Sequence, residues 1–462
     1  MKKYILWTGI ILVLCIGLLA GCKAQEDDAV VLNIANCEEY IDEGGWDESE
    51  TIALEDGTKI IGINSMISDF ETWYEKKYGK KVKVKYSTYG NNEELYNQMS
   101  LGNVYDLVCP SDYMIMKLMG EDRLQPFSDH FLDASDRDNY YVRGVSAYFK
   151  DQFNNLKVKG DQLSNYAAGY MWGNCGIVYN PDKVDRADVT TWEILRNSKY
   201  RKRVTLKDSV RDSYFVSLGI LNRRQLLSND LSVSQRTEIL NDASAKTIDK
   251  AEAILSDIRE NAYSLENESG KADMVTGKVY ANMQWSGDAV YAMNQAEEDG
   301  IRLRYAVPEE CSNLWFDGWC MMKDGVNGSK EKQQAAEAFI NFISRSDNVI
   351  RNMYYIGYTS AISGDDDLIY QYVKYCYEST DENAQAYPLG YFFENGSEKD
   401  NKKYTIMADK EQFDRQLSAQ YPPEEIIQRC TIMKNFDSKE NERISQMWIN
   451  IRCFDPGFEI IK

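Results

Sequence analysis

Short apolar segments with the period of β-strands alternate along this chain with longer segments that have the period of α-helices. Val82, Val84 and Tyr86 alternate with lysines, which predicts a strand with one buried face. Apolar residues recur at helical spacing over 63–78, and Gly79 stands where such a helix would end. Strands that alternate with helices form sheets covered by helices, so this pattern predicts an α/β fold.

The alternation extends through most of the chain. Further strands are expected at 30–35, 106–109, 203–206, 279–283, 303–307 and 319–322, and further helices at 92–100, within 208–219, at 287–298 and at 329–345. The 462 residues are too many for one compact core, and no proline-rich linker, repeat or low-complexity tract divides them. We therefore expect two α/β lobes between which the chain crosses more than once, with a ligand cleft between them.

The N-terminal segment has the layout of a secretory signal. Two lysines precede an uncharged apolar run over 4–21, and the Leu-Ala-Gly-Cys sequence that ends at Cys22 matches the bacterial lipobox. These features predict a signal peptide over 1–21, lipid attachment to Cys22 and a lipid-anchored spacer over 22–29. The alternative is a plain transmembrane anchor, because an uncharged run of this length can just span a bilayer.

Composition argues against several classes of partner and cofactor. The formal net charge is −20, and removal of the two N-terminal lysines leaves 51 basic against 73 acidic residues, or −22. Such a surface repels nucleic acid and suits a cationic ligand, although acidic solubility accounts for the charge equally well. His130 is the only histidine and no CxxC pair is present, so we expect mostly free thiols and neither a metal nor a cofactor.

Catalytic motifs are absent from the sequence. There is no GxSxG, Walker A, HExxH or EF-hand pattern, and His130 lies in a polar stretch unsuited to a Ser-His-Asp triad. A glycosidase-type carboxylate pair remains an alternative among 73 acids, but no pair is singled out. We expect no catalytic residues.

Acidic and aromatic residues recur where the predicted strands end or begin. The set comprises Glu38, Glu39, Tyr40, Asp112, Tyr113, Asp208, Asp212, Trp285, Trp315, Phe316 and Asp317. Any one of them would more often be a helix cap or a core ring. Together they supply what an elongated alkyl-amine cation needs, because ring faces attract ammonium groups and carboxylates offset the cost of burying them.

At these residues the sequence resembles the spermidine/putrescine-binding proteins of bacterial polyamine ABC transporters. The resemblance runs from about Val31 to Ile362 and more faintly beyond. It is carried by the order and spacing of the segments 84–89 (VKYSTY), 92–94 (NEE), 105–113 (YDLVCPSDY), 170–173 (YMWG), 208–212 (DSVRD), 315–317 (WFD) and 356–358 (IGY). It implies a two-lobed periplasmic-binding-protein fold of type II-like form that closes on a polyamine and delivers it to a permease.

The resemblance also implies a set of ligand-binding residues. With Glu38 from the strand-end pattern, the predicted site is Glu38, Tyr40, Ser111, Tyr113, Asp208, Asp212, Trp285, Trp315, Asp317 and Tyr358. Cys37 stands where the family commonly has Trp, and Ser209 occupies one acid position, for which Asp208 is the expected substitute. The family's C-terminal Gln has no clear counterpart, although Gln428 and Lys434 lie near the expected stretch.

The predicted organisation follows from this family. Lobe 1 is expected to comprise 30–173 and 314–362, and lobe 2 to comprise 174–313 and 363–462, with extra length mainly in 41–60 and 364–420. We expect a monomeric, non-catalytic, extracytoplasmic protein that is lipid-anchored to the cell membrane and binds a polyamine and an ABC permease, but no nucleic acid. A binding protein for another small solute, a secreted hydrolase and a surface adhesin remain alternatives.

The lipid anchor can be tested at Cys22. A Cys22→Ser substitution is expected to release the protein or leave it unprocessed, because no thiol remains for lipid attachment. Metabolic labelling with palmitate measures this, and a label that persists in the variant would rule out Cys22 as the anchor.

Overall fold

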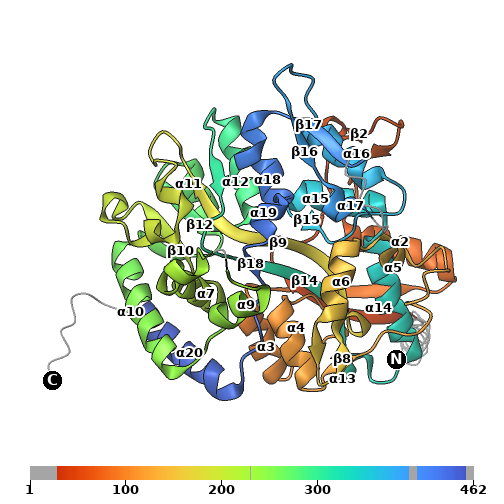
Figure 1. The fold of residues 1–462 in the computed structure, drawn as a ribbon. Helices are drawn as coiled ribbons and strands as arrows, with labels where there is room; N and C mark the ends of the chain where they lie inside the picture. Colours follow the sequence, from red (N-terminus) through yellow and green to blue (C-terminus); the bar gives the residue numbers. More distant parts are fainter. Residues whose placement is uncertain (1–28, 229, 395–402, 454–462) are drawn as a thin grey trace, which may run out of the picture.

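A computed structural model describes residues 29–228, 230–394 and 403–453, and it has the predicted α/β architecture (Figure 1). A 12-stranded mixed sheet runs through the molecule, with helices packed around it. The predicted signal peptide and Cys22 lie outside the described residues. Within the described residues, no helix is both long and apolar enough to cross a membrane.

Two groups of parallel strands form the two ends of the sheet. In the first group β1 pairs with β4 and β5, and in the second β10 pairs with β11 and β12. These strands are β1 (Val30–Cys37), β4 (Val82–Tyr89), β5 (Leu107–Val108), β10 (Val204–Lys207), β11 (Ser264–Glu266) and β12 (Ala281–Trp285). The carboxyl ends of parallel strands are where α/β proteins place their ligand sites.

Two long antiparallel strands, β9 (Ala167–Tyr179) and β14 (Ser312–Met322), join the two groups. β9 pairs with β12 on one side, and β14 pairs with β5 on the other. The sequence did not predict β9, because all of its residues are buried and no alternation of apolar and polar positions marks it. The segment 315–317, expected to precede a strand, lies inside β14.

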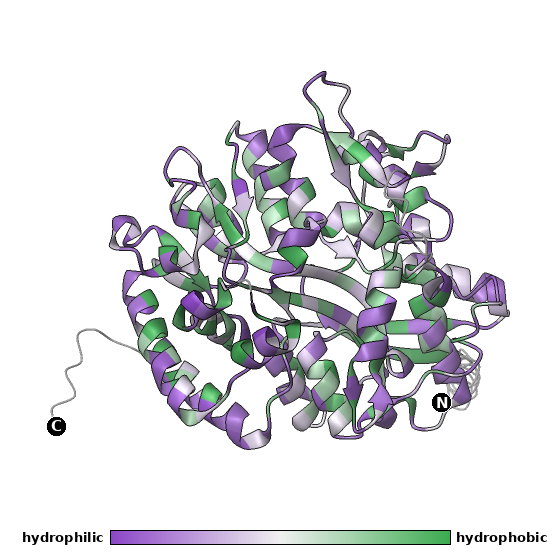
Figure 2. Ribbon diagram, viewed as in Figure 1, coloured by the Kyte–Doolittle hydropathy of each residue, from purple (hydrophilic) through white to green (hydrophobic). Residues whose placement is uncertain are grey.

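The predicted helices form at or near their expected bounds. They are α2 (Met66–Tyr78), α3 (Asn92–Ser100), α4 (Asp112–Gly120), α7 (Val210–Leu221), α12 (Ser286–Glu298) and α14 (Lys330–Ile343). The Ser65 hydroxyl accepts a hydrogen bond from the Ser68 amide at the start of α2, and Gly79 ends that helix with φ +64°. Figure 2 shows hydrophobic residues along the central strands and on one side of several helices.

Additional helices and short strands complete the fold. The longer ones are α6 (Ala147–Asn155), α9 (Val233–Leu240), α10 (Ala245–Asn261), α11 (Ser269–Val275), α15 (Ser346–Ile356), α16 (Leu368–Tyr377) and α20 (Ser438–Arg452), and the further sheet strands include β13 (Arg304–Ala306), β15 (Thr359–Ser360) and β18 (Cys430–Thr431). A hairpin of β16 (Gln385–Pro388) and β17 (Thr405–Ala408) stands apart from the main sheet. Helices α10 and α20 lie beside the second strand group.

Buried apolar side chains form two large cores and a small third one. The first core draws on 32–172 and 314–421, the second on 175–283, Cys311 and 433–451, and the third surrounds α12. Most buried apolar residues between Ile369 and Tyr421 join the first core, whereas 363–462 was expected in lobe 2. The lobe boundaries remain a prediction, and this packing favours moving 369–421 to the first lobe because α16 packs on α15.

The segment 41–60, expected to be a loop insertion, is ordered by a buried ion pair. It contains a short hairpin of β2 (Ile52–Ala53) and β3 (Lys59–Ile60). Asp42 is fully buried, and its Oδ2 lies 2.6 Å from Nη2 of Arg351 on α15. Arg351 also contacts Asp69, with Nη1 2.7 Å from Oδ2. This network fixes the chain just after Tyr40.

An Asp42→Asn substitution is expected to lower the free energy of unfolding by about 3–5 kcal/mol, because it leaves the buried Arg351 without its full counter-charge. Urea denaturation measures the change. The exposed pair of Lys83 and Glu71, with 3.2 Å between Nζ and Oε2, supplies the control. Lys83→Gln should cost less than about 1 kcal/mol, and an equal loss in both variants would contradict the prediction.

Candidate ligand-binding site

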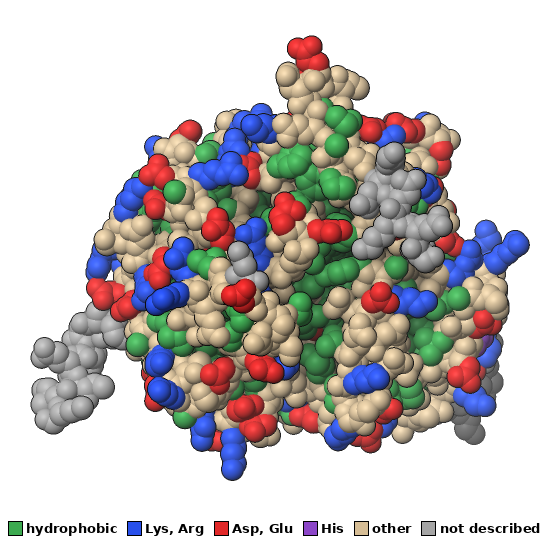
Figure 3. All heavy atoms as spheres, in the orientation of Figure 1, with side chains coloured by type: hydrophobic (Ala, Val, Ile, Leu, Met, Phe, Trp, Pro, Cys, Tyr) green, Lys and Arg blue, Asp and Glu red, His purple; other side chains and the backbone are tan. Residues whose placement is uncertain are grey.

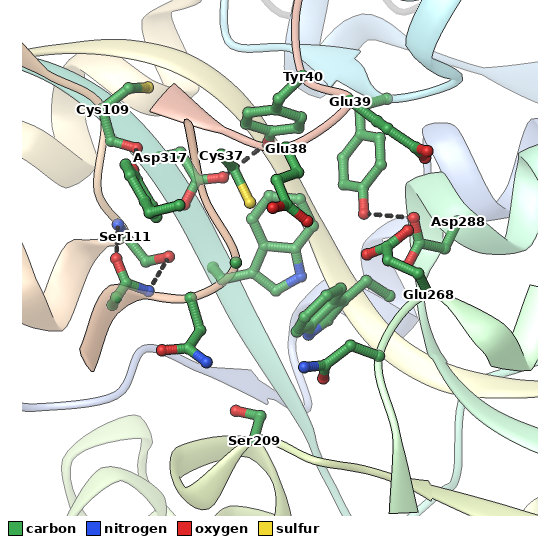
Figure 4. Close-up of a pocket in the computed structure, with 18 of the residues that line it drawn as sticks. Cys37, Glu38, Glu39, Tyr40, Cys109, Ser111, Ser209, Glu268, Asp288 and Asp317 are labelled. Carbon is green, nitrogen blue, oxygen red and sulfur yellow. Dashed lines mark hydrogen bonds between the residues drawn. The ribbon is translucent and has the colours of Figure 1, made fainter. Parts of the chain in front are cut away.

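A pocket of about 490 Å³ lies where the carboxyl ends of both parallel strand groups meet (Figure 4). The segments that follow β1, β4 and β5 line it from the first group. The segments that follow β10, β11 and β12 line it from the second group, and residues of β14 and 355–358 complete the wall. The pocket therefore draws on both of the large cores.

All of the predicted site residues except one line this pocket. They are Glu38, Tyr40, Ser111, Tyr113, Asp212, Trp285, Trp315, Asp317 and Tyr358. Their part in ligand binding stays a prediction, but the fold brings them together from distant parts of the chain. Gln428 and Lys434 are not among the lining residues, whereas the neighbouring Met433 is.

Asp208 does not line the pocket, so the structure does not support the expectation that it replaces Ser209. Its Oδ2 lies 3.2 Å from Nη2 of Arg452 on α20. Ser209 is the N-cap of α7 and lines the pocket, where its hydroxyl donates to Asp212 Oδ2 at 2.7 Å. β10 ends at Lys207, and the turn from there into α7 directs Ser209 rather than Asp208 into the pocket.

Asp317 is the acid most closely surrounded by other predicted residues. The Tyr40 hydroxyl donates to its Oδ2 at 2.7 Å, and Ser111 pairs with it across an isolated antiparallel bridge. Burial raises the pKa of Asp317 to about 6, although the hydrogen bonds from Ser111 and Tyr40 act in the opposite direction. The carboxylate is thus poorly compensated until a positive group reaches it.

Aromatic rings cover the pocket beside Asp317. The Tyr40 ring lies edge-on to Tyr170 and Tyr358, with centroids 5.4 and 5.1 Å apart, and Trp315 lies 5.6 Å from Tyr358. The Trp285 indole donates to Asp212 Oδ2 at 3.3 Å, which links a ring to a second acid. Such rings can cover methylene groups and attract an ammonium at their faces.

Three further acids line the same part of the pocket. Asp212 and Asp112 are buried and Glu93 is half-buried, and removal from water raises the pKa of each carboxyl. Within the described ranges, none of these acids, nor Asp317, forms an ion pair with a lysine or arginine. Arg211 is nearby, with its guanidinium 4.6 Å from the Tyr113 ring centroid. The local field still favours a cation, because acids outnumber this one base.

A second acidic group also lines the pocket, and the strand-end pattern of the sequence singled out only one of its members, Glu39. Glu268 follows β11, Asp288 lies in the first turn of α12, and Glu39 follows β1. Each contacts the ammonium of Lys271, with Nζ distances of 2.6, 3.7 and 3.3 Å respectively. Glu268 was missed because the strand before it, β11, was not predicted. Asp288 was missed because it lies within a predicted helix and not at the end of a strand.

Cys37 lies in the pocket wall at the end of β1 (Figure 4). Its side chain is partly exposed and packs against the first core. Burial, together with nearby acids such as Asp317, raises the pKa of the thiol well above its usual value. A small, uncharged thiol therefore occupies this part of the wall.

The outer surface contrasts with the pocket. Figure 3 shows acidic and basic side chains intermingled over one face, without a continuous basic patch on that face. Among the residues that the structure describes, no group of three or more His, Cys, Asp or Glu side chains is arranged to hold a metal ion.

This chain resembles known solute-binding proteins. Residues 66–366 match the family of bacterial extracellular solute-binding proteins. The spermidine/putrescine-binding periplasmic protein of Escherichia coli is 26% identical over 342 residues, which cover 74% of this chain and 80% of the relative. The putrescine-binding periplasmic protein SpuD of Pseudomonas aeruginosa is 27% identical over 342 residues, covering 71% and 77%.

A solved structure supports the fold. The spermidine/putrescine ABC transporter substrate-binding protein PotD of Streptococcus pneumoniae matches 92% of this chain and 99% of its own, with a TM-score of 0.58 and 22% identity. The predicted two-lobed α/β fold of a periplasmic binding protein is confirmed.

The raised pKa of Asp317 predicts a pH-dependent cost in the ligand-free protein. Between the ordinary value near 3.8 and about 6, the folded state keeps a proton that the unfolded state releases, so stability falls as pH rises. An Asp317→Asn variant lacks this effect. It should be more stable than the unsubstituted protein by about 1–3 kcal/mol at pH 7.5, and nearly equal to it at pH 4.

Thermal unfolding of both proteins across this range measures the difference. A melting-temperature difference that does not change with pH would show that the charge of Asp317 is not the cause.

Proposed function

The chain belongs to the family of bacterial extracellular solute-binding proteins, and from this premise we propose that it captures a polyamine of the spermidine and putrescine class. The polyamine would bind in the pocket between the two strand groups and be delivered to the permease of an ABC transporter. The relatives from Escherichia coli and Pseudomonas aeruginosa, which are spermidine/putrescine- and putrescine-binding proteins, support this ligand class.

One observation carries the proposal: a buried carboxylate and a half-buried one, Asp212 and Asp317, lie beside aromatic rings without basic partners among the described residues. Asp317 and Asp212 are held by hydrogen bonds from Tyr40, Ser209 and Trp285, but by no ion pair with a base in the described part of the chain. A buried unpaired carboxylate is costly, and an ammonium group that binds there relieves the cost. Few other small solutes offer both ammonium groups and an alkyl chain.

The geometry supports a simple binding mechanism. An ammonium near Asp317 would favour its ionised form, while the rings of Tyr40, Trp315 and Tyr358 would cover methylene groups. The first strand group supplies Tyr40, and the second supplies Asp212 and Trp285. A ligand that contacts both lobes binds the closed arrangement better than the open one, so it would shift the protein toward closure.

The remaining parts of the proposal concern the envelope. We propose that Cys22 carries the lipid anchor, that the protein acts as a monomer at the outer face of a membrane or in the periplasmic space, and that it catalyses no reaction. A secreted hydrolase with a carboxylate pair is the alternative from another class. A screen against glycans separates them, because turnover without amine binding would favour the hydrolase.

Calorimetric titration with putrescine, spermidine and spermine tests the ligand class. Asp317→Asn is expected to weaken amine binding by about 2–5 kcal/mol, because one partner of a buried charge pair loses its charge. In the unsubstituted protein the affinity should rise from pH 5 to pH 7, since Asp317 with its pKa of about 6 must ionise to pair with the ligand.

Asp208→Asn is the matched control, because this neighbouring acid pairs with Arg452 outside the pocket. The amine affinity of this variant should stay within about threefold of that of the unsubstituted protein. A change below tenfold for Asp317→Asn would mean that Asp317 has only a structural role.

A further inference from the structure

A lysine already occupies one end of the pocket. Lys271 lies on α11, its side chain is mostly buried, and its ammonium is 2.6 Å from Glu268 Oε2 and 3.3 Å from Glu39 Oε2. Its Nζ is also 5.1 Å from the centroid of the Tyr291 ring, another residue of the pocket wall. Carboxylates and a ring around an ammonium are the surroundings that a bound amine would need.

The position of Lys271 is set by the end of β11. The Gly270 amide donates to Glu266 Oε2 at 2.7 Å, and a β-carbon at Gly270 would lie 2.2 Å from Glu266 Oε1. This close approach fixes the first turn of α11 against the strand. Burial lowers the pKa of Lys271, but the carboxylates of Asp288 and Glu268 outweigh burial and raise it, so the side chain stays charged.

A second lysine, Lys207, pairs with an acid at the same end of the pocket. Lys207 is fully buried, and its ammonium donates to the Asn267 carbonyl at 2.6 Å and to Asp288 Oδ2 at 3.2 Å. The Tyr358 hydroxyl donates to the other oxygen of Asp288 at 2.9 Å. Asp288 therefore has its hydrogen-bond and charge partners before any ligand binds.

At the opposite end of the pocket no cation of the described residues forms an ion pair with the acids, although the Arg211 guanidinium lies nearby against the Tyr113 ring. Asp317 and Asp212 lack an ion pair with any lysine or arginine of the described chain, and the Tyr40 and Ser209 hydroxyls are their closest partners. The pocket thus combines one end where the acids have no ion-pair partner in the described chain with another end where Lys271 and Lys207 already form ion pairs with the acids.

We propose that Lys271 takes the place of one ligand ammonium and so sets the preference of the pocket for amines with two ammonium groups over those with three or four. This inference rests on the proposed function and deepens it. A third ammonium on the ligand would have to displace Lys271 from its carboxylates or lie beside it. Two positive charges in adjacent positions repel each other. A ligand with two charges avoids this conflict.

Calorimetric titration of the full mature protein with three probes tests the proposal at pH 7.5. Putrescine carries two charges, spermidine three, and monoacetylated spermidine carries two on a chain as long as that of spermidine. Putrescine and monoacetylated spermidine should bind at least tenfold more tightly than spermidine. Rejection of the acetylated probe along with spermidine would mean that length, not charge, limits the ligand, and would overturn the proposal.

Two substitutions at Lys271 provide the decisive comparison. Lys271→Gln should shift the spermidine-to-putrescine affinity ratio at least tenfold toward spermidine, while Lys271→Arg should keep the original ranking. Lys278→Gln is the matched control, because Lys278 follows the same helix and pairs with Asp273 at 3.0 Å but does not line the pocket. Thermal melts confirm that each variant is folded.

The outcomes distinguish this inference from the function on which it rests. If the unsubstituted protein binds amines but Lys271→Gln leaves the ranking unchanged, the specificity role of Lys271 is wrong and the proposed function survives. If Lys271→Gln weakens every amine alike, Lys271 acts as a bridge between the lobes through Glu39, and the inference is again wrong. If no amine binds to any form, both proposals fail.

Discussion

The antiparallel pairing of β9 with β14 is the constraint on which the rest of the structure depends. β9 contributes residues to both large apolar cores and β14 to the first, so the pair holds the two parallel strand groups with their carboxyl ends toward one pocket. The pairing requires a close approach at Gly173, where a β-carbon would lie 2.2 Å from Ser286 Oγ and 2.7 Å from the Trp315 indole. The pocket wall is therefore built directly on the crossing strands.

Two fully buried acids outside this pocket have basic ion-pair partners, which Asp317 and Asp212 inside it lack in the described part of the chain. Asp42 pairs with Arg351, and the fully buried Asp106 pairs with Lys332, whose Nζ is 2.8 Å from Oδ1. Asp317 and Asp212 receive hydrogen bonds but no such base within the described residues. Unpaired buried charge lowers stability, and it gathers at sites where a ligand completes the set. Lys271 shows that the same chain can also supply that missing charge itself.

Local sequence determined much of the secondary structure and most of the candidate site. The helices α2, α3 and α14 follow from apolar spacing and end residues within a few positions, such as Ser65 and Gly79. The acids and rings at strand ends came together because the carboxyl ends of parallel strands meet at one edge of a sheet. Periodicity and strand-end chemistry are local properties, so one sequence is enough to read them.

Tertiary structure decided what local patterns could not express. β9 is buried on both faces, so its continuity and its pairing with β14 depend on long-range contacts that leave no periodic signal. The turn into α7 placed Ser209 in the pocket and Asp208 against Arg452, although the two residues are adjacent in the sequence. Lys271 met Glu39 across 232 positions of sequence. Side-chain direction and the pairing of distant charges are set by the packed fold, because no short segment fixes either one.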